Sequence, residues 1–394
     1  MDYKFSDRIA SLQPSAIREI LKATASPEVI PFAAGNPAPE AFPVDAVREI
    51  GANILMHKAT QALQYGITEG YAPLREFVLK YMAQKHKVGK ADDDIIITSG
   101  ATQVMDITSK SFLNEGDTVI CENPSFIGSL NCFRSYNAKL VGVEVEKDGM
   151  NMEKLEEVLK KEKKAKFIYT IPNFQNPSGA TMSLEKRKKM YELACKYDVL
   201  ILEDNPYGDL RVEGKYIPSI KSFDTDGRVI YAGSFSKILA PGIRVGLAIA
   251  NKKIISKLTV AKQTADTHTP MFSQMLVYQW LNEYDFEGHI RKIQDIYRNK
   301  LELMCSLIDS ELGDFVSYHK PQGGLFVWCE LPEKVDMLEF VRVAVENKVA
   351  VVPGSAFMVD EKEKTQCIRL NFSTPTDEKI KQGMKILGQV KKQF

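Results

Sequence analysis

The chain has 394 residues, of which 44% are hydrophobic and 26% are charged, and its formal net charge is +1. This length exceeds the roughly 250–300 residues at which a single hydrophobic core stops growing, so two domains are expected. The balanced charge gives no reason to expect nucleic acid or an anionic membrane surface as a partner.

No targeting or membrane segment is expected. The first residues, MDYKFSDRIASLQPSAIREIL, lack the apolar core of a secretory signal, and apolar runs such as Val199 to Leu202 are strand-sized. The six cysteines form no Cys-x-x-Cys pair, and the five histidines show no metal-ligand spacing. We therefore expect no metal site, and the scattered cysteines fit a reducing, cytoplasmic compartment.

Short apolar runs alternate with helical patterns through the middle of the chain. The segment ATQVMDITSKSFL follows the first run as a helix, and Met190, Leu193, Ala194 and Tyr197 recur at helical spacing. Strands separated by helices, each continuously apolar, predict an α/β fold with a mostly parallel sheet sandwiched by helices. The strands are predicted at 95–98, 118–121, 139–145, 167–170, 199–202, 229–232 and 245–250.

The pattern changes after about residue 285, where a long charged amphipathic helix is predicted over 287–310. Strands at 324–330 and 367–372, separated by a helix at 337–347, indicate a smaller α/β domain. Residues 1–44, rich in proline from Pro27 to Pro43, are expected to wrap back onto that domain. The predicted organisation is an N-terminal arm at 1–44, a large domain at 45–285 and a small C-terminal domain at 286–394.

Ligands of open parallel sheets bind beyond the carboxyl ends of the strands, so the residues at those ends are the first candidates for a site. The turn SGATQ at 99–103 opens a helix and exposes backbone N–H groups suited to a phosphate, although a plain tight turn explains the same residues. Phe126, after the next strand, can lie flat against a ring or belong to the core. Either feature alone leaves both interpretations open.

The later strand ends carry more chemistry. An Asn-Pro-Ser-Gly turn fixes Asn176, and Asp204 follows the strand predicted at 199–202 with a carboxylate that needs a partner, because burying it unpaired is costly. Tyr207 follows, and Ser234, Ser236, Lys237 and Arg244 lie at the junction of the last two strands. Together these groups predict a site for a phosphorylated, protonatable aromatic ring that reacts with an amine.

These motifs resemble those of the fold-type-I pyridoxal-5′-phosphate (PLP) enzymes, specifically the class I/II aminotransferases. The subgroup containing 2-aminoadipate, kynurenine and aromatic aminotransferases is the most similar. The resemblance implies the fold-type-I architecture, with PLP covalently bound to Lys237. The matching segments are FAAGNPAPEAFP (32–43), LQYGITEGYAPLRE (63–76), TSGATQ (98–103), NPSG (176–179), EDNPYGDL (203–210), SFSKILAPGIRVG (234–246) and IRLNFS (368–373).

The resemblance also implies a role for each matched residue. Lys237 shuttles a proton and needs a lowered pKa, which desolvation and Arg244 would favour. Asp204 holds the ring nitrogen protonated, and Tyr207 and Asn176 donate to the ring's phenolic oxygen. Phe126 stacks on the ring, where many relatives have tyrosine. The phosphate is held by Gly100, Ala101, Thr102, Ser234, Ser236 and Arg244.

On the substrate side, Arg369 matches the arginine that grips the α-carboxylate, and Gly35 and Asn176 approach the same group. Tyr65 matches a residue that relatives lend to the neighbouring subunit's phosphate, which implies a homodimer with shared sites. The expected substrates are an L-amino acid and a 2-oxo acid such as 2-oxoglutarate, used in a ping-pong reaction.

Two other functions remain open on the sequence. A carbon–sulfur β-lyase needs the same lysine, aspartate and arginine, and some bacterial transcription regulators carry this domain behind a winged helix. Only about 30 residues precede GNPAP, which are too few for such a DNA-binding module. Aromatic, 2-aminoadipate and branched-chain donors all fit, and Arg18 or the 264–274 loop could set the choice among them.

Overall fold

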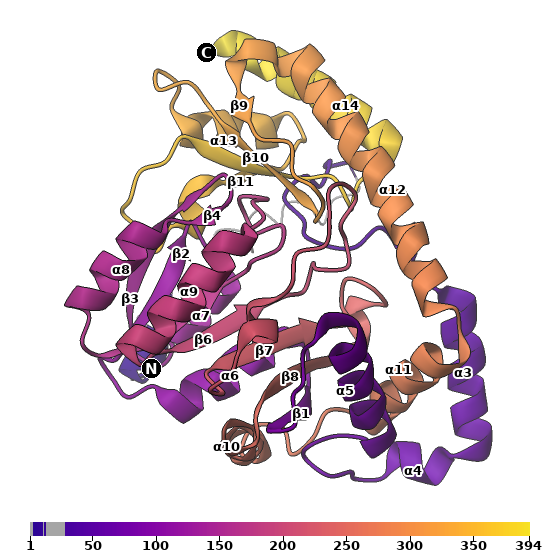
Figure 1. Ribbon diagram of the computed structural model, residues 1–394. Helices are drawn as coiled ribbons and strands as arrows, with labels where there is room; N and C mark the ends of the chain where they lie inside the picture. Colours follow the sequence, from indigo (N-terminus) through magenta and orange to yellow (C-terminus); the bar gives the residue numbers. More distant parts are fainter. Residues whose placement is uncertain (1–2, 11, 13–27) are drawn as a thin grey trace.

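The computed structural model describes residues 3–10, 12 and 28–394. These residues build two sheets, one of eight strands and one of four, with helices packed around both (Figure 1). The first segment is the short helix α1 (Asp7–Ala10), and the 3-10 turn η1 (Pro39–Ala41) comes before the main body. Within the described residues, no helix is long and apolar enough to cross a bilayer.

The large sheet has the strand order β1-β8-β7-β6-β5-β2-β3-β4. Its neighbours run parallel from β3 through β2, β5 and β6 to β7, as the apolar runs predict. Only its margins are antiparallel: β8 against β1 and β7, and β4 against β3. The strands are β1 (Asp93–Thr98), β2 (Thr118–Asn123), β3 (Lys139–Glu146), β4 (Gly149–Met150), β5 (Ala165–Thr170), β6 (Leu200–Asp204), β7 (Val229–Ser234) and β8 (Gly246–Asn251).

The direction of β8 determines what lies at the edge of the sheet. The connection from β7 to β8, residues 235–245, holds only the short turn η3 (Pro241–Ile243) and no crossover helix. A parallel neighbour needs a longer crossover, so the chain turns back instead. Gly246 therefore pairs with both Thr98 and Ser234, and the start of β8 lies beside the ends of β1 and β7.

Helices cover both faces of the large sheet, and in the central strands β2 and β5 alternate residues face opposite clusters. Phe167 and Tyr169 of β5 belong to the main core, whereas Ile168 between them packs with residues of α8 and α9. This burial on both faces explains why the strands are continuously apolar. The helices are α3 (Val44–His57), α4 (Ala59–Leu63), α5 (Ala72–His86), α6 (Ala101–Phe112), α7 (Ile127–Arg134), α8 (Met152–Lys161), α9 (Leu184–Tyr197), α10 (Lys252–Gln263) and α11 (Met271–Glu283).

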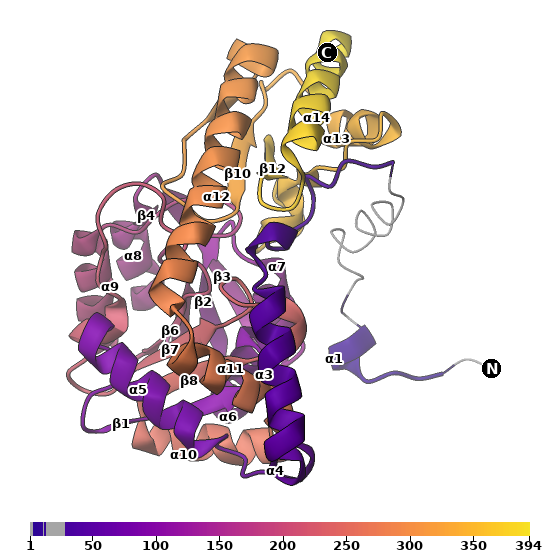
Figure 2. The same ribbon diagram turned by 90° about the vertical axis from the view of Figure 1, so that its right-hand side faces the viewer.

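The small sheet has the order β11-β12-β10-β9 and is antiparallel throughout. Helix α12 (Phe286–Leu307) extends from the end of α11 to this sheet in both views (Figures 1 and 2). The remaining elements are η4 (Ile308–Leu312), η5 (Gly313–Phe315), β9 (Ser317–Tyr318), β10 (Phe326–Glu330), α13 (Met337–Glu346), β11 (Val352–Pro353), η6 (Gly354–Phe357), β12 (Cys367–Asn371), α14 (Asp377–Val390) and η7 (Lys391–Gln393).

The segment that begins at residue 28 packs on the small sheet. Ile30 forms a parallel bridge with Val349, and the carbonyl of the fully buried Phe32 accepts a 2.8 Å hydrogen bond from the amide of Asn371. The packing of the whole predicted arm, 1–44, on the small domain and the boundaries of the three predicted segments remain predictions.

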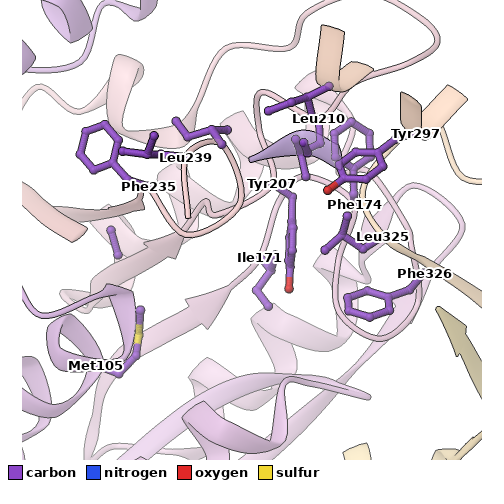
Figure 3. Close-up of a cluster of buried hydrophobic side chains, with 14 of the residues drawn as sticks. Met105, Ile171, Phe174, Tyr207, Leu210, Phe235, Leu239, Tyr297, Leu325 and Phe326 are labelled. Carbon is purple, nitrogen blue, oxygen red and sulfur yellow. The ribbon is translucent and has the colours of Figure 1, made fainter. Parts of the chain in front are cut away.

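A cluster of buried side chains joins the two parts of the molecule (Figure 3). Tyr207 lies there beside Ile171, and Leu325 and Phe326 approach from the side of the small sheet. Tyr297 of α12 belongs to the same cluster, and its hydroxyl accepts a 3.1 Å hydrogen bond from the amide of Ala38. Segments far apart in the sequence are thereby fixed around the strand ends.

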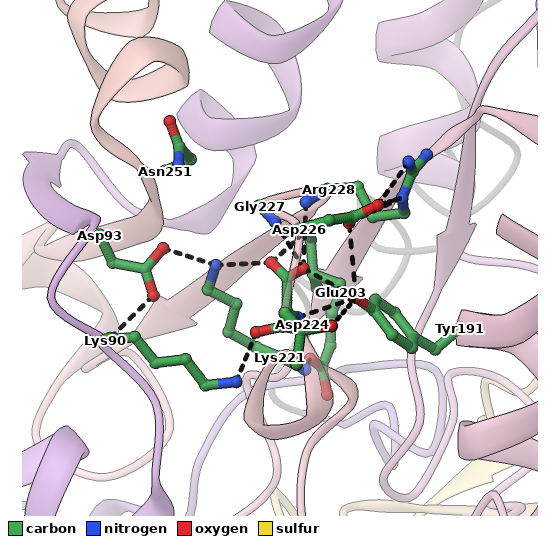
Figure 4. A network of polar contacts seen from close by, with 12 residues as sticks. Lys90, Asp93, Tyr191, Glu203, Lys221, Asp224, Asp226, Gly227, Arg228 and Asn251 are labelled. Carbon is green, nitrogen blue, oxygen red and sulfur yellow. Dashed lines mark hydrogen bonds and ion pairs between the residues drawn. The ribbon is translucent and has the colours of Figure 1, made fainter. Parts of the chain in front are cut away.

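At the opposite end of the large sheet, a buried ion cluster fixes the start of two strands (Figure 4). Lys221, in η2 (Ile220–Phe223), contacts the carboxylates of Asp93 and Asp224, each at 2.8 Å. Asp93 begins β1, and Asp224 also accepts from the amide of Val229 at the start of β7. The cluster therefore ties together the two strands that flank β8.

Candidate active site

The predicted residues that follow β1, β2, β5, β6 and β7 lie at the carboxyl edge of the large sheet, as expected for parallel strands. Arg244 joins them from the start of β8, because β8 runs in the opposite direction. Arg369 comes from β12 of the small sheet and contacts Asn176 beyond the end of β5. The site therefore lies where the two sheets meet.

The turn between β1 and α6 has the geometry of an anion cradle. Gly100 has φ +88°, and a Cβ there would come within 2.3 Å of an Arg244 guanidinium nitrogen. That guanidinium donates to the Ser99 carbonyl at 2.9 Å. Gly100 caps α6 without a side-chain hydrogen bond, so the backbone N–H groups of Ala101 and Thr102 begin the helix uncapped.

Glycine is also required on the other side of this turn. A Cβ on Gly246 would lie 2.7 Å from the Gly100 carbonyl carbon and 2.8 Å from the Ala101 nitrogen. Beside it, the Ser234 hydroxyl accepts from the amide of the buried Ser236 at 3.1 Å. The cradle is thus built by backbone that only glycines allow to approach so closely.

A polar network that the sequence analysis did not identify supports the cradle from behind. The fully buried Lys262 donates to Gln103, Asp266 and Thr269 at 2.7–3.1 Å. Ser99 in turn donates to Asp266 at 2.7 Å. These groups come from α10, α6 and the 264–274 loop, so that loop supports the turn between β1 and α6. The same loop is one of the segments expected to set the substrate specificity.

Lys237 is partly buried, and its amine donates to the carbonyl of Gly35 at 2.8 Å. Burial lowers the pKa of Lys237 to about 8, and the positive charges of Arg369 and Arg244 act in the same direction. A substantial fraction of this amine is therefore neutral near physiological pH, which a nucleophile or a proton acceptor requires.

Asp204, the last residue of β6, is 4% exposed. Burial raises the pKa of this carboxyl to about 7, while a 2.8 Å hydrogen bond from the hydroxyl of Tyr169 opposes the shift. The Ser129 hydroxyl donates to the Tyr169 hydroxyl at 2.8 Å, so the tyrosine proton points toward Asp204. Oδ1 of Asp204 has no hydrogen-bond partner among the described residues. A buried acceptor without a partner fits a ligand that brings a donor.

Arg369 is 3% exposed and lies between the rings of Phe326 and Phe357, at 4.2 and 4.9 Å from their centroids. It donates to the Asn176 side-chain oxygen at 2.9 Å and to the Ala33 carbonyl at 2.8 Å. Its Nε has no partner in the part of the chain that the structure describes. Burial lowers the pKa of Arg369 to about 10, so it remains a cation, and no carboxylate among the described residues pairs with it.

Tyr207 is 6% exposed and meets Phe326 edge-on, with centroids 6.1 Å apart. Burial raises the pKa of its hydroxyl well above the usual range, and the Asp204 charge adds to that effect, so the hydroxyl stays a donor at neutral pH.

Phe126 precedes the first residue of α7 and packs against the main core. This position is compatible both with stacking on a ring and with a role in the core.

The turns after β2 and β5 are held together by Glu122, which the sequence analysis also missed. This buried carboxylate accepts from the Thr170 hydroxyl at 2.6 Å, the Ile171 amide at 3.0 Å and the Gln175 amide at 3.2 Å. Burial raises its pKa to about 7 despite these hydrogen bonds. It therefore links the turn that carries Phe126 to the loop that carries Asn176.

Tyr65 does not join the other predicted residues within one chain. Its side chain is 82% exposed and meets His268 edge-on, with ring centroids 5.8 Å apart. Arg18 lies outside the described residues, so the structure gives it no position.

Pyridoxal phosphate fits these residues by the chemistry of its parts. The cradle at Gly100 suits a phosphate, and the unpartnered Oδ1 of Asp204 suits a protonated ring nitrogen. Lys237 supplies an amine with a lowered pKa, as an aldehyde requires. A site with these three features at the edge of a fold-type-I sheet is that of a PLP-dependent enzyme.

Comparison with known proteins agrees with the assignment as a PLP-dependent enzyme. The family "Aminotransferase class I and II" matches residues 27–387. An aromatic-amino-acid aminotransferase of Thermococcus litoralis is 41% identical, covering 100% of this chain and 95% of its own. A kynurenine aminotransferase of Pyrococcus horikoshii, solved in complex with PMP, superposes with a TM-score of 0.95 at 38% identity and covers 99% of this chain and 97% of its own.

A third relative is the α-aminoadipate aminotransferase of Thermus thermophilus, solved with N-(5′-phosphopyridoxyl)-L-leucine. Its TM-score is 0.91 at 38% identity, with 99% of this chain and 97% of that chain covered. The chain therefore belongs to the class I and II aminotransferase family. It is a PLP-dependent aminotransferase of fold type I, as the resemblance predicted.

Proposed function

We propose that this enzyme transfers the amino group of an aromatic amino acid, 2-aminoadipate or a similar L-amino acid to a 2-oxo acid such as 2-oxoglutarate. The observation that carries the proposal is the partly unsatisfied Arg369 guanidinium, buried beside an amine whose pKa is lowered. Relatives named for aromatic, 2-aminoadipate and kynurenine substrates support this choice of donors.

In this proposal Arg369 binds the substrate α-carboxylate, with Asn176 holding one guanidinium nitrogen in place at 2.9 Å. Gly35 lies beside the same position, where a Cβ would come within 3.3 Å of the Phe326 ring. Because the guanidinium is fixed on both sides by aromatic rings, the substrate enters in one orientation.

Lys237 would hold the cofactor covalently, and its Nζ, whose pKa is lowered, would move the proton at the substrate Cα. When bound, PLP supplies a protonated ring that takes up the electron pair left by that proton. Asp204 keeps the ring nitrogen protonated, and Tyr169 holds Asp204 ionised through its 2.8 Å hydrogen bond. Tyr207 and Asn176 would donate hydrogen bonds to the ring's phenolic oxygen, and Phe126 would stack on the ring.

The phosphate is bound by the backbone of Gly100, Ala101 and Thr102, the hydroxyls of Ser234 and Ser236, and Arg244. Tyr65 completes the phosphate site of a second subunit in a homodimer. The exposed apolar side chains of Leu63, Tyr65 and Ile67 support a partner at this surface. A cytoplasmic location is supported by the six cysteines, which are all free thiols.

A half-reaction assay tests the function. The purified enzyme loaded with PLP is mixed with single L-amino acids without an oxo acid, and the cofactor absorbance is recorded. We expect stoichiometric loss of the band, restored by 2-oxoglutarate, with aromatic or 2-aminoadipate donors fastest and D-enantiomers inactive. Continuous release of pyruvate and ammonia without an acceptor would instead identify a β-lyase and overturn the proposal.

Complementation tests the shared site. Tyr65→Ala and Lys237→Ala subunits, each of low activity alone, are mixed under conditions that exchange subunits. A dimer with shared sites regains activity, because one of the two sites in each hybrid then has both residues native. Mixtures that stay as inactive as the parents contradict the shared site.

A further inference from the structure

A cavity with a volume of about 460 Å³ lies beside β7 and the loop that follows β6. It is bounded by α5, the loop after β6, the strand β7 and the first turns of α12. Of the residues predicted for the catalytic site, only Ser234 lines it. Its size is that of a small-molecule pocket.

The wall of this cavity is mostly apolar and aromatic, with Phe77, Met82, Phe235, Leu247, Leu281 and Ile290 among its residues. Such a surface binds the hydrocarbon part of a ligand by removing it from water. The polar groups therefore decide which ligand fits.

The charged groups that line the cavity have protein partners, with one exception. Lys85 pairs with Glu287, Arg291 with Asp285 and Arg298 with Asp295. The remaining pairs are Arg211 with Gln322, Glu213 with Lys320 and His86 with Tyr216. The carboxylate of Asp209 has no hydrogen bond or ion pair in the described part of the chain, and only its backbone carbonyl accepts, from Gln294 at 2.9 Å.

Asp209 is partly buried, and burial raises its pKa, with the Glu287 charge acting in the same direction and Lys85 against it. The hydroxyls of Tyr81 and Tyr231 do not donate to the Asp209 carboxylate. Tyr81 donates its proton to Glu287 at 3.0 Å, and the Tyr231 hydroxyl accepts from Asn205 at 3.1 Å. A partly buried carboxylate that lines a mostly apolar cavity and has no partner among the described residues favours a cation that brings its own donor.

We propose that this cavity is a second ligand site, which binds a small organic ammonium ion with an apolar or aromatic body, its nitrogen on Asp209. Lys85, Arg291 and Arg298 pair with carboxylates, and Arg211 donates to the Gln322 side-chain oxygen and the Glu213 carbonyl, whereas the Asp209 carboxylate has no donor among the described residues. The bound body would contact Tyr231, whose hydroxyl accepts from Asn205, the residue next to Asp204.

A tertiary amine tests this site on the holoenzyme, because it cannot condense with the cofactor aldehyde. N,N-dimethyl-2-phenylethylamine is titrated into the protein by calorimetry, beside its neutral isostere N,N-dimethyl-2-phenylacetamide. We expect one amine bound per chain, at least about 10-fold more tightly than the amide, since a desolvated charge pair distinguishes them. Absence of binding at millimolar amine, or equal affinity for the amide, overturns the proposal.

Three variants locate the binding. Asp209→Asn is expected to lower the affinity for the amine at least about 10-fold. Val78→Phe, which fills the cavity from α5, is expected to abolish binding. Asp314→Asn, on the exposed turn η5, controls for the loss of one negative charge and leaves the affinity unchanged. Unchanged affinity in Asp209→Asn overturns the site, and the amine–amide comparison on wild-type protein still decides if that variant fails to fold.

Discussion

The hydroxyl of Tyr169 lies 2.8 Å from Oδ2 of Asp204 and donates to it, while the other carboxylate oxygen has no partner among the described residues. The pair joins β5 to β6 across neighbouring parallel strands. One oxygen is thus held by the protein, and the other is free to accept from the cofactor nitrogen in the role proposed for Asp204.

Removing the tyrosine hydroxyl is expected to weaken the binding of the cofactor rather than to destabilise the fold. Tyr169→Phe takes away the one donor that opposes the raised pKa of Asp204, so the carboxyl, already near pKa 7, is more often neutral at neutral pH. The lost hydrogen bond to a charged group is worth about 1.5–3 kcal/mol, or about 10- to 100-fold in cofactor affinity. Absorbance titration with PLP between pH 6 and 9 measures this.

The loss should be greatest at the acid end of that range and shrink as the pH rises above the new pKa. Ser129→Ala serves as the control, since it removes only the group that donates to Tyr169 and leaves the donor to Asp204 in place. A pH-independent loss of affinity would show that Tyr169 acts by packing alone.

Lys237→Met is expected to stabilise the cofactor-free chain. The pKa of Lys237 is about 8 in the folded state, against its ordinary value of 10.5 in an unfolded chain, so the unfolded chain binds more protons between these values. The cost of charging the buried amine is therefore full below pH 8 and disappears as the pH rises above 10.5. After allowance for the lost hydrogen bond to Gly35, we expect a gain of about 1–2 kcal/mol at pH 7.

Urea unfolding of the cofactor-free wild type and variant at pH 7 and pH 10 measures this gain, which should be smaller at pH 10. The same variant should have no turnover. A variant less stable than the wild type at pH 7 would mean that the lysine amine is satisfied in the absence of cofactor.

Gly246→Ala tests the close packing of the phosphate cradle. The new methyl group would lie 2.7–2.9 Å from the backbone of Gly100 and Ala101, so β8 must move away from the turn. We expect a loss of about 1–3 kcal/mol in unfolding free energy, with weaker binding of PLP. Gly242→Ala is the matched control, because a Cβ there meets nothing within 4 Å. Similar behaviour of the two variants would contradict the packing argument.

Arg369→Lys is expected to separate carboxylate binding from the rest of the site. Lysine cannot reproduce the planar guanidinium held by Asn176, the Ala33 carbonyl and the two rings. Affinity for the 2-oxo acid should fall by about 2–5 kcal/mol, as in other broken buried charge pairs. Phenethylamine, which lacks the carboxylate, should bind wild type and variant alike in spectral titrations. An equal loss for both ligands would assign Arg369 a structural role.

Much of this site could be predicted because its residues follow apolar strands that the sequence marks clearly. Asp204, Tyr207 and Asn176 lie at strand ends with turn-forming neighbours, so their common edge follows from the parallel sheet. Tyr169 and Glu122 were missed because they lie within the apolar runs or at their ends, and only the pairing of β5 with β2 and β6 reveals what they face. The antiparallel direction of β8 was likewise not encoded in its apolar composition.

Lys221→Met tests how far the stability of the sheet depends on the buried ion cluster. Asp93 and Asp224 each lie 2.8 Å from the Lys221 amine, and all three side chains are at most 5% exposed. Removing the cation leaves two buried carboxylates without their counter-ion, which costs about 3–5 kcal/mol. Lys154→Met, which breaks the exposed pair with Glu144, should cost at most about 1 kcal/mol.

The pH dependence distinguishes this cluster from simple packing. Burial acts to raise the pKa of Asp224, but Lys221 outweighs it and keeps that pKa below 3.8, so the pair stabilises the fold above pH 3.8 and the effect is lost as the pH falls through the folded pKa. The difference between wild type and Lys221→Met in urea unfolding should therefore be full at pH 7 and smaller at pH 4, where the carboxylates left without their cation can protonate. A difference that does not change with pH would indicate lost packing of the lysine chain.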